Sequence, residues 1–456
     1  MNIKNNSKYI KKNDIFICTH DEQEDRHKYI DDAIKKGAKL IITDQNITNK
    51  KVPIIKVEDT NQTMYQIYND YYDNPLEKIN LIGITGTDGK TTTALIIKDL
   101  LEQKTPCAYI GTNGFIYKNN QINTKNTTPE IKEVLKYAKI LNQKQIENLV
   151  IEISSEALFH NRCEGLLFDR IILTNITKDH LNTHKTFENY LNSKLKIIEK
   201  LKKDAIAIIN IDDKNSTHFL KKVPNYITYG TKKEADFQIT NIKEYDNHTK
   251  FTLVHKEKKY KIISPLLGIY NTYNLTAAIV LLKTYNYNLN NIINNIYNIK
   301  EIPGRMNIKR KNNKTIILDY AHTINATENI LNYANKIKKK RIITVVGCAG
   351  GREKEKRPTI GKIVTQKSDY VIFTTDDPRY EKVTDIINDM TKEIEKENYQ
   401  IIINRKKAIK HAIEEAKEQD IVLILGKGID NYMAIKNKYK KYCDKDVIEK
   451  ILKKKK

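Results

Sequence analysis

Short apolar runs, rich in β-branched residues, recur along this chain, and segments with helical spacing separate them. Runs of strand length lie at residues 14–18, 39–43, 149–154, 170–175, 205–211, 315–318, 341–347, 369–373 and 420–425. Such runs, alternating with helices, are typical of a mostly parallel sheet whose two faces are both covered. The hydrophobic pattern therefore predicts an α/β fold.

Breaks in this pattern divide the chain into three predicted domains, the number that a length of 456 residues also suggests. An Asn-Pro linker closes an N-terminal α/β domain at residues 1–77. A central domain covers residues 78–301, with an antiparallel excursion at 233–263 and then a helix at 271–282. In the C-terminal α/β domain, residues 302–456, polar and glycine-containing loops follow most strands. Ligands bind at the carboxyl ends of such strands, so we expect an active site there.

Composition restricts the class of protein. Five cysteines are scattered without a CxxC pair, which argues against a disulfide framework or a zinc site and fits a reducing compartment. The N-terminus has no signal-peptide pattern, and no apolar run reaches the length of about 20 residues that spans a bilayer. We therefore expect a cytoplasmic protein with no membrane partner.

The formal net charge of +24 raises the question of nucleic acid. The lysines are spread along the whole chain, however, and the sequence contains no arginine-rich stripe and no RNP-type aromatic motif. We expect no nucleic-acid partner, although a basic surface would attract an anionic substrate.

The stretch LIGITGTDGKTTTALIIKDL, residues 81–100, carries the strongest chemical signal. It combines an apolar strand, a tight turn and an amphipathic helix, and its turn and first helical residues are Gly86, Thr87, Asp88, Gly89, Lys90, Thr91 and Thr92. Glycines let backbone N–H groups approach phosphates, the lysine reaches their oxygens, and a hydroxyl ligates magnesium at the helix N-terminus. Because Ile84 occupies the first glycine position of GxxxxGK[ST], this is the shorter GTxGKTT form. It predicts a nucleoside triphosphate site, with a capped helix start as the alternative.

Two further residues follow apolar strands of the predicted central sheet. Glu152 stands at the end of one strand, and His180 comes shortly after another. Magnesium prefers carboxylate and water oxygens, with occasional help from a neutral imidazole. Glu152 could instead cap a helix and His180 could be an ordinary loop histidine, but the adjacent phosphate loop favours a metal site.

A set of motifs in this chain resembles the Mur ligases of peptidoglycan synthesis. The motifs are GTDGKTTT, EISSEAL, TNITKDHLNTH, YLNSK, IPGRM, LDYAHT, GREKEKRP, DDPR and GKG, and they cover almost the whole chain in the family's order. The resemblance is greatest to the members that add a diamino acid to UDP-N-acetylmuramoyl-L-alanyl-D-glutamate. It implies a central P-loop mononucleotide-binding domain, an N-terminal UDP-substrate domain and a C-terminal Rossmann-like amino-acid-binding domain.

The resemblance also implies roles for individual residues. Lys90 and Thr91 would bind the phosphates of ATP and Mg²⁺, and Glu152 and His180 would be further metal ligands. Lys194 matches the family's carbamylated lysine, so that Lys90, Lys194 and His180 would form the catalytic set. The positions that match the UDP-muramoyl dipeptide site are Asn126, Thr127, Thr128, Ser154, His160 and Arg162, with His160 in a slot often filled by glutamine. Those that match adenine, phosphate and ribose contacts are Asn274, Arg305 and Asp319. Those that match the amino-acid pocket are Arg352, Asp377, Arg379, Gly426 and Asp430.

Departures from the family pattern concern mainly the amino-acid pocket. Members that use meso-diaminopimelate usually read DNPR and GKGHE, whereas this chain reads DDPR, with Asp377 in the asparagine position, and GKGID. The extra negative charge favours a cationic end, as in lysine or ornithine, while Arg379 favours a carboxylate. We lean to diaminopimelate. Glu156 also replaces the histidine of SSHAL, and Ile324-Asn325 replaces Pro-Asp after LDYAHT.

The reaction implied is peptide-bond formation through an acyl phosphate, with protein groups that position reactants and neutralise charge. Closure of the third domain over the second would bring the reactants together. We expect a monomer. The alternatives are a ligase acting on a pseudomurein-type precursor, a folylpolyglutamate synthetase-like enzyme and, from another class, a P-loop ATPase stimulated by nucleic acid.

Overall fold

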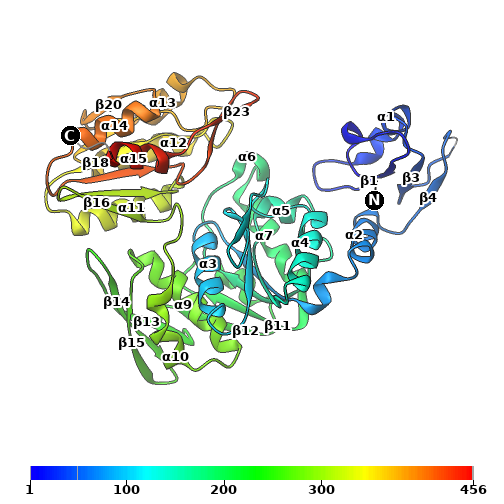
Figure 1. The fold of residues 1–456 in the computed structure, drawn as a ribbon, viewed down its shortest axis with the longest axis horizontal. Helices are drawn as coiled ribbons and strands as arrows, with labels where there is room; N and C mark the ends of the chain where they lie inside the picture. The colour runs from blue at the N-terminus through cyan, green and yellow to red at the C-terminus, as the bar shows by residue number, and fades with distance from the viewer. Residues whose placement is uncertain (1, 49, 454–456) are drawn as a thin grey trace.

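The computed structural model describes residues 2–48 and 50–453 and begins with a small parallel sheet. Its strand order is β1-β2-β3-β4, with bounds Ile3–Lys4, Ile15–Ile17, Leu40–Thr43 and Ile54–Lys56. Helices α1 (Ile30–Lys35) and α2 (Thr60–Tyr71) accompany it (Figure 1). Tyr68 of α2 donates its hydroxyl to the carbonyl of Ile3 but packs with the core of the next sheet. Helix α2 therefore joins the first unit to the second.

The central sheet has the order β15-β14-β13-β12-β11-β10-β5-β9-β6-β7-β8. In this spatial order, all strands from β13 through β6 run parallel to one another. At the two edges, β14 and β15 and likewise β7 and β8 each pair antiparallel with the preceding strand. The bounds are β5 Asn80–Thr85, β6 Cys107–Gly111, β7 Gly114–Tyr117, β8 Asn120–Ile122, β9 Asn148–Glu152, β10 Phe168–Leu173, β11 Leu201–Asn210, β12 Tyr226–Gly230, β13 Phe237–Glu244, β14 Thr249–His255 and β15 Lys258–Ser264.

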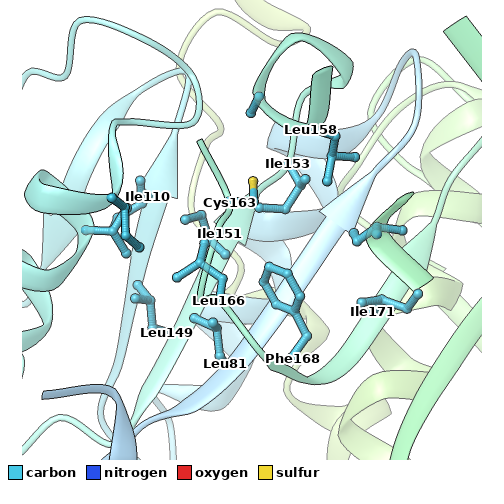
Figure 2. Packing of buried hydrophobic residues seen from close by; sticks show 14 of the residues in the cluster. Leu81, Ile110, Leu149, Ile151, Ile153, Leu158, Cys163, Leu166, Phe168 and Ile171 are labelled. Carbon is cyan, nitrogen blue, oxygen red and sulfur yellow. The ribbon is translucent and has the colours of Figure 1, made fainter. Parts of the chain in front are cut away.

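Helices cover both faces of this sheet, which explains its continuous apolar strands. Successive strand residues point to opposite faces, so Leu81 lies in one core and Ile82 and Ile84 in the other. Figure 2 shows the first core, where Leu149 and Ile151 of β9 lie with Leu81 of β5. The helices are α3 Lys90–Leu101, α4 Ile131–Gln143, α5 Ser155–Phe159, α6 Leu181–His184, α7 Phe187–Leu195, α8 Ser216–Leu220, α9 Ile269–Thr284 and α10 Leu289–Asn294.

The third sheet has the order β16-β17-β21-β18-β19-β20, parallel except for β16. Its strands are β16 Asn307–Lys311, β17 Lys314–Asp319, β18 Ile342–Val346, β19 Tyr370–Phe373, β20 Tyr399–Ile401 and β21 Ile421–Leu425, and β22 Tyr432–Ile435 and β23 Lys438–Lys441 form a separate hairpin. The helices are α11 Ile324–Ile337, α12 Lys356–Lys367, α13 Val383–Thr391, α14 Arg405–Glu415 and α15 Asp444–Lys453. The carboxyl ends of the parallel strands meet at one edge, which gathers the loops after β17, β18, β19 and β21.

The predicted α/β class is confirmed, as are the predicted strands and the antiparallel excursion. Most strand bounds differ by one or two residues, and the largest difference is at the strand predicted to start at residue 205, which starts at Leu201. The hairpins of β6 to β8 and of β22 and β23 were not predicted. The domain limits at 77 and 301 stay predictions, and residues 1 and 454–456 of the outer domains lie outside the described residues. Of the helices described, none combines the length and apolar character needed to cross a membrane.

Candidate active site

A cavity of about 1170 Å³ lies between the central and C-terminal units and contains most of the predicted site residues. Its lining includes Thr87, Asp88, Gly89, Lys90, Thr91, Thr92, Asn126, Thr127, Glu152, Ser154, Arg162, His180, Asn274, Arg305, Asp319, Arg352, Asp377, Arg379, Gly426 and Asp430. The predicted residues outside the lining are Gly86, Thr128, His160 and Lys194. The fold thus brings together positions that lie up to 343 residues apart, from residue 87 to residue 430.

The phosphate loop needs its glycines for close approach to neighbouring segments. At Gly86 (φ 147°) a Cβ would lie 1.9 Å from Thr174 Oγ1 and 3.0 Å from the Asn175 carbonyl oxygen. At Gly89 (φ 85°) it would lie 2.5 Å from Asn274 Oδ1. The Lys90 ammonium donates to the carbonyls of Gly86 and Thr87, both at 2.8 Å. Burial lowers the pKa of this ammonium.

Glu152 is fully buried at the end of β9, beside the first turn of α3. Its carboxylate accepts hydrogen bonds from Thr91 Oγ1 and from the Thr112 N–H, both at 3.0 Å, and from the Tyr109 hydroxyl. These donors are hydroxyls and a loop N–H, not the N–H groups of a helix end. The helix-capping alternative is therefore wrong for Glu152.

His180 lies on the cavity wall in the left-handed backbone region, with φ 57°. Its Nδ1 lies 3.5 Å from Oε1 of Glu156, which also lies 3.6 Å from Nη1 of Arg352. The hydrogen bond with His180 holds the pKa of Glu156 below its usual range. The carboxylate that replaces the family's histidine thus joins His180 to a residue of the C-terminal unit.

Lys194 is buried behind the phosphate loop. Its Nζ donates to the Gly86 carbonyl at 2.8 Å and lies 4.8 Å from the centre of the Tyr190 ring, and the Tyr190 hydroxyl lies 2.7 Å from Thr87 Oγ1. Burial, with the nearby Lys90, lowers the pKa of Lys194 well below its usual value. In the described part of the chain this ammonium has no carboxylate within ion-pair distance. An unmodified ammonium offers no metal ligand.

The predicted magnesium site can be tested on these contacts. The Thr91 hydroxyl and the Glu152 carboxylate lie together on the cavity wall, and both are oxygen ligands of the kind that magnesium takes. Among residues 2–48 and 50–453, no three His, Cys, Asp or Glu side chains are grouped closely enough to hold a metal ion. Magnesium commonly uses one or two carboxylates together with water and substrate phosphates. Thr91 and Glu152 therefore fit this ion.

The predicted adenine, phosphate and ribose residues frame the cavity from two units. Asn274 of α9 accepts a hydrogen bond from Thr93 Oγ1 at 3.2 Å. The Arg305 guanidinium lies 4.8 Å from the Tyr320 ring centre and donates to Thr91 Oγ1 at 3.4 Å. The Asp319 carboxylate accepts the N–H groups of Met306 and Ala321, both at 2.7 Å. Asp319 therefore fixes the shape of the loop after β17.

The residues predicted to bind the dipeptide form a hydrogen-bond network around Thr128, which is itself buried. The Thr128 hydroxyl donates to the Glu152 carbonyl at 2.7 Å and accepts from the Ser154 N–H at 3.0 Å, and Arg162 donates to the Thr128 carbonyl at 3.1 Å. His160 faces the N-terminal unit, where its Nδ1 lies 3.2 Å from Asp21 Oδ2. Thr128 thus positions other side chains, and His160 connects two units.

The predicted amino-acid pocket is built around a lysine that sequence reasoning did not single out. Lys427, between the glycines after β21, is buried, and its Nζ lies 2.7 Å from Asp377 Oδ1, 3.8 Å from Asp430 Oδ2 and 3.9 Å from Asp376 Oδ1. By contrast, the Arg379 side chain makes no ion pair within the described ranges, and it lies beside Gly351. The negative charge at Asp377 is therefore neutralised inside the protein.

Asp430 has a different environment from Asp377. Burial raises the pKa of its carboxyl to about 7, and this carboxyl accepts the Tyr320 hydroxyl. Tyr109, Tyr190 and Lys427 were the main residues missed. Tyr190 and Lys427 stand inside motifs that were quoted, whereas Tyr109 looks like any tyrosine of an apolar strand.

The fold and the site define an α/β protein in which a phosphate loop faces a second α/β unit across a cavity. Family models for the "Mur ligase middle domain" and the "Mur ligase, glutamate ligase domain" match residues 84–282 and 304–428. The chain belongs to the Mur ligase family.

Similar proteins cover nearly the whole chain. UDP-N-acetylmuramoyl-L-alanyl-D-glutamate--2,6-diaminopimelate ligases from Clostridium botulinum and Aquifex aeolicus are each 37% identical, over 99% and 98% of this chain and 95% and 92% of their own lengths. A solved structure of an enzyme with this name is 27% identical, covers 99% of this chain and 94% of its own, and has a TM-score of 0.68. A folylpolyglutamate synthase of Mycobacterium tuberculosis shares the fold at 14% identity and a TM-score of 0.68, over 80% of this chain and 92% of its own.

Proposed function

We propose that the protein is an ATP-dependent ligase that joins meso-diaminopimelate to UDP-N-acetylmuramoyl-L-alanyl-D-glutamate in peptidoglycan synthesis. The relatives with 37% identity carry this name. The structural observation that carries the choice of amino acid is the contrast between Asp377, which Lys427 neutralises, and the Arg379 guanidinium, which makes no ion pair in the described residues. The available guanidinium of Arg379 favours an amino acid with a second carboxylate.

The chemistry follows from the weakness of a carboxylate as an acyl donor. The γ-phosphoryl group of ATP moves to the D-glutamate side-chain carboxylate, which gives an acyl phosphate and ADP. The amine of the diamino acid attacks the acyl carbon, the C–N bond forms, and phosphate leaves as the amine loses its proton. No protein nucleophile is needed, so the protein positions the groups and balances their charge.

The residues around the phosphate loop would hold the phosphates. Lys90, at the start of α3, supplies a cation beside the loop, and Arg305 supplies a second from the C-terminal side. Thr91 and Glu152 would hold Mg²⁺, which supplies charge neutralisation for phosphoryl transfer when it is bound. His180 also lines the cavity and would complete the set. Asn274 and Asp319 would border the adenine and ribose.

We also propose that Lys194 is carbamylated. The neutral amine would add to carbon dioxide, forming an N–C bond and releasing a proton, so that the residue becomes an anion. Its position supports this proposal, because Nζ lies against Gly86 of the phosphate loop and the described residues place no carboxylate beside it. The product would face the loop with oxygen atoms suited to magnesium.

The remaining predicted site residues would serve the two other substrates. Asn126, Thr127, Ser154 and Arg162 would contact the UDP-muramoyl dipeptide, with Thr128 and His160 behind them. Arg352 and Arg379 would bind carboxylates of the diamino acid, Asp430 its ammonium group, and Gly426 would leave room for it. Because the central and C-terminal units of the same chain both line the cavity and all three substrates are water-soluble, we propose that the enzyme acts as a cytoplasmic monomer.

One assay tests this proposal against its alternatives. Phosphate release should require ATP, Mg²⁺, the UDP-muramoyl dipeptide and a diamino acid together, and diaminopimelate should outperform lysine and ornithine run side by side. Release that is stimulated by DNA or RNA and indifferent to the dipeptide would instead indicate the nucleic-acid ATPase. Activity on folate substrates or on a pseudomurein-type precursor would identify the other ligases.

A further inference from the structure

Asp88 places a carboxylate in the middle of the predicted phosphate loop, where its negative charge would repel a bound phosphate. The backbone of Asp88 is fixed on the central unit: its N–H donates to Asn175 Oδ1 at 3.0 Å, and its carbonyl accepts Thr174 Oγ1 at 2.7 Å. Its side chain extends from this fixed backbone to the C-terminal unit.

The Asp88 carboxylate contacts the beginning of helix α11. Thr323 Oγ1 lies 3.2 Å from each of its oxygens, and Asn325 Nδ2 lies 3.4 Å from Oδ2. Thr323 is the N-cap of α11 and accepts the Ala326 N–H at 3.1 Å. A carboxylate at the N-terminus of this 14-residue helix interacts favourably with the helix dipole. The negative charge of the loop thus has a partner from the other unit.

The side chains at positions 88 and 325 are complementary in this chain, because an amide donor faces a carboxylate acceptor. Asn325 donates an amide hydrogen to Asp88, and it stands where the motif of the resembling family carries an aspartate. An aspartate at 325 would place a second carboxylate next to Asp88, where like charges repel. Asn325, 237 positions from Asp88 in the sequence, therefore suits a carboxylate at position 88.

We propose that Asp88 is a positioning residue that latches the C-terminal unit onto the phosphate loop, with Thr323 and Asn325 as its partners. This inference rests on the proposed function, since the latch matters for a reaction that joins ATP on one unit to an amine on the other. Across the cavity, Lys356 lies 3.8 Å from Asp179 and Glu353 accepts the Leu181 N–H. The Asp88 contact joins the start of helix α11 directly to the turn of the phosphate loop.

A charge-swap cycle tests the latch. Asn325→Asp should lower kcat/KM for the diamino acid about tenfold, because two carboxylates then face each other. Asp88→Asn should lower it about threefold, through loss of the helix-dipole interaction. The double variant Asp88→Asn with Asn325→Asp should return to within about threefold of wild type, because an amide and a carboxylate again face each other. Thermal unfolding of each variant checks that the fold is retained.

Asn329→Asp is the matched control, because it adds the same charge to α11 one turn further along. Its effect should multiply with that of Asp88→Asn, without rescue. Solution scattering adds a readout independent of turnover: Asn325→Asp should have a larger radius of gyration than wild type, and the double variant should return to the wild-type value.

The outcomes separate this inference from the proposed function. If the wild-type protein releases no phosphate with dipeptide and diaminopimelate, the proposed function fails, and scattering still decides the latch. If wild type is active but the effects at 88 and 325 multiply, or the radius of gyration does not follow the swap, the latch is refuted.

Discussion

The Lys427 ammonium lies 2.7 Å from Asp377 Oδ1, and both residues are buried. The Ala434 N–H donates to the same oxygen at 3.0 Å. The pair therefore ties the loop after β19 to the loop after β21 and to the hairpin of β22 and β23. Arg379, two residues after Asp377, also joins this hairpin, because its N–H donates to the Ala434 carbonyl at 3.0 Å.

Asp377→Asn should leave amino-acid selectivity unchanged. Lys427 neutralises Asp377, and after the substitution Asp376 and Asp430 remain within 3.9 Å of Lys427 to balance its charge. The ratio of kcat/KM for diaminopimelate to that for lysine should stay within about threefold of wild type. If the ratio instead shifted toward diaminopimelate by more than about tenfold, Asp377 would be a residue that selects the substrate by its charge.

Arg379→Lys should selectively weaken the use of diaminopimelate. An ammonium cannot reproduce the two parallel hydrogen bonds that a guanidinium makes to a carboxylate. We expect a loss of about tenfold or more in kcat/KM for diaminopimelate and little change for lysine. Arg352→Lys, measured in parallel, serves as the comparison because both amino acids carry an α-carboxylate. An equal loss for both amino acids in Arg379→Lys contradicts the assignment.

Lys194→Ala should abolish turnover, and added bicarbonate should not restore it. The carbamate itself can be sought without an activity assay, by ¹³C NMR of the wild-type protein equilibrated with labelled bicarbonate. A carbamate resonance that is present in wild type and absent in Lys194→Ala is the expected result. Near-normal activity of the alanine variant would rule out the carbamate.

The KM for the diamino acid should depend on pH through Asp430. Its pKa is raised to about 7, so the carboxylate that would bind the substrate ammonium is lost as pH falls below that value. KM should therefore rise from pH 8 to pH 6, and Asp430→Asn should have a higher KM without this dependence. Because a raised pKa makes ionisation costly in the folded state, stability is lost as pH rises through the interval from the ordinary value of about 4 to about 7. Asp430→Asn should accordingly raise Tm more at pH 8 than at pH 5.

Asp444→Ala should strongly destabilise the C-terminal unit. Arg405 and Asp444 are both fully buried, with Arg405 Nη2 2.6 Å from Asp444 Oδ2, so the substitution leaves a buried guanidinium without its carboxylate. The expected cost is about 3 to 5 kcal/mol in urea unfolding. Glu414→Ala breaks the exposed pair with Lys410 and should cost about 0 to 1 kcal/mol. Similar values for the two would contradict the role of burial.

Local features of this protein could be predicted from sequence, and contacts between distant segments could not. The phosphate loop is contiguous, and its glycines and lysine have direct chemical meaning, so its geometry was foreseen. Buried strands of both large sheets gave long apolar runs, whereas β8 has exposed residues and too few of them to form a pattern. The Lys427–Asp377 pair joins residues 50 positions apart, and no local rule says that the lysine of a GKG loop meets that aspartate.

The crowding around Gly86 has a consequence for resistance to inhibitors. Any side chain there would strike Thr174 and the backbone of Asn175, and the backbone cannot move aside without disturbing strand β10. Gly86 itself lies outside the cavity lining, so a compound in the cavity would meet the loop at Thr87 to Thr92. A substitution at Gly86 could displace such a compound only by shifting the whole loop, and that shift would also disturb the proposed phosphate site.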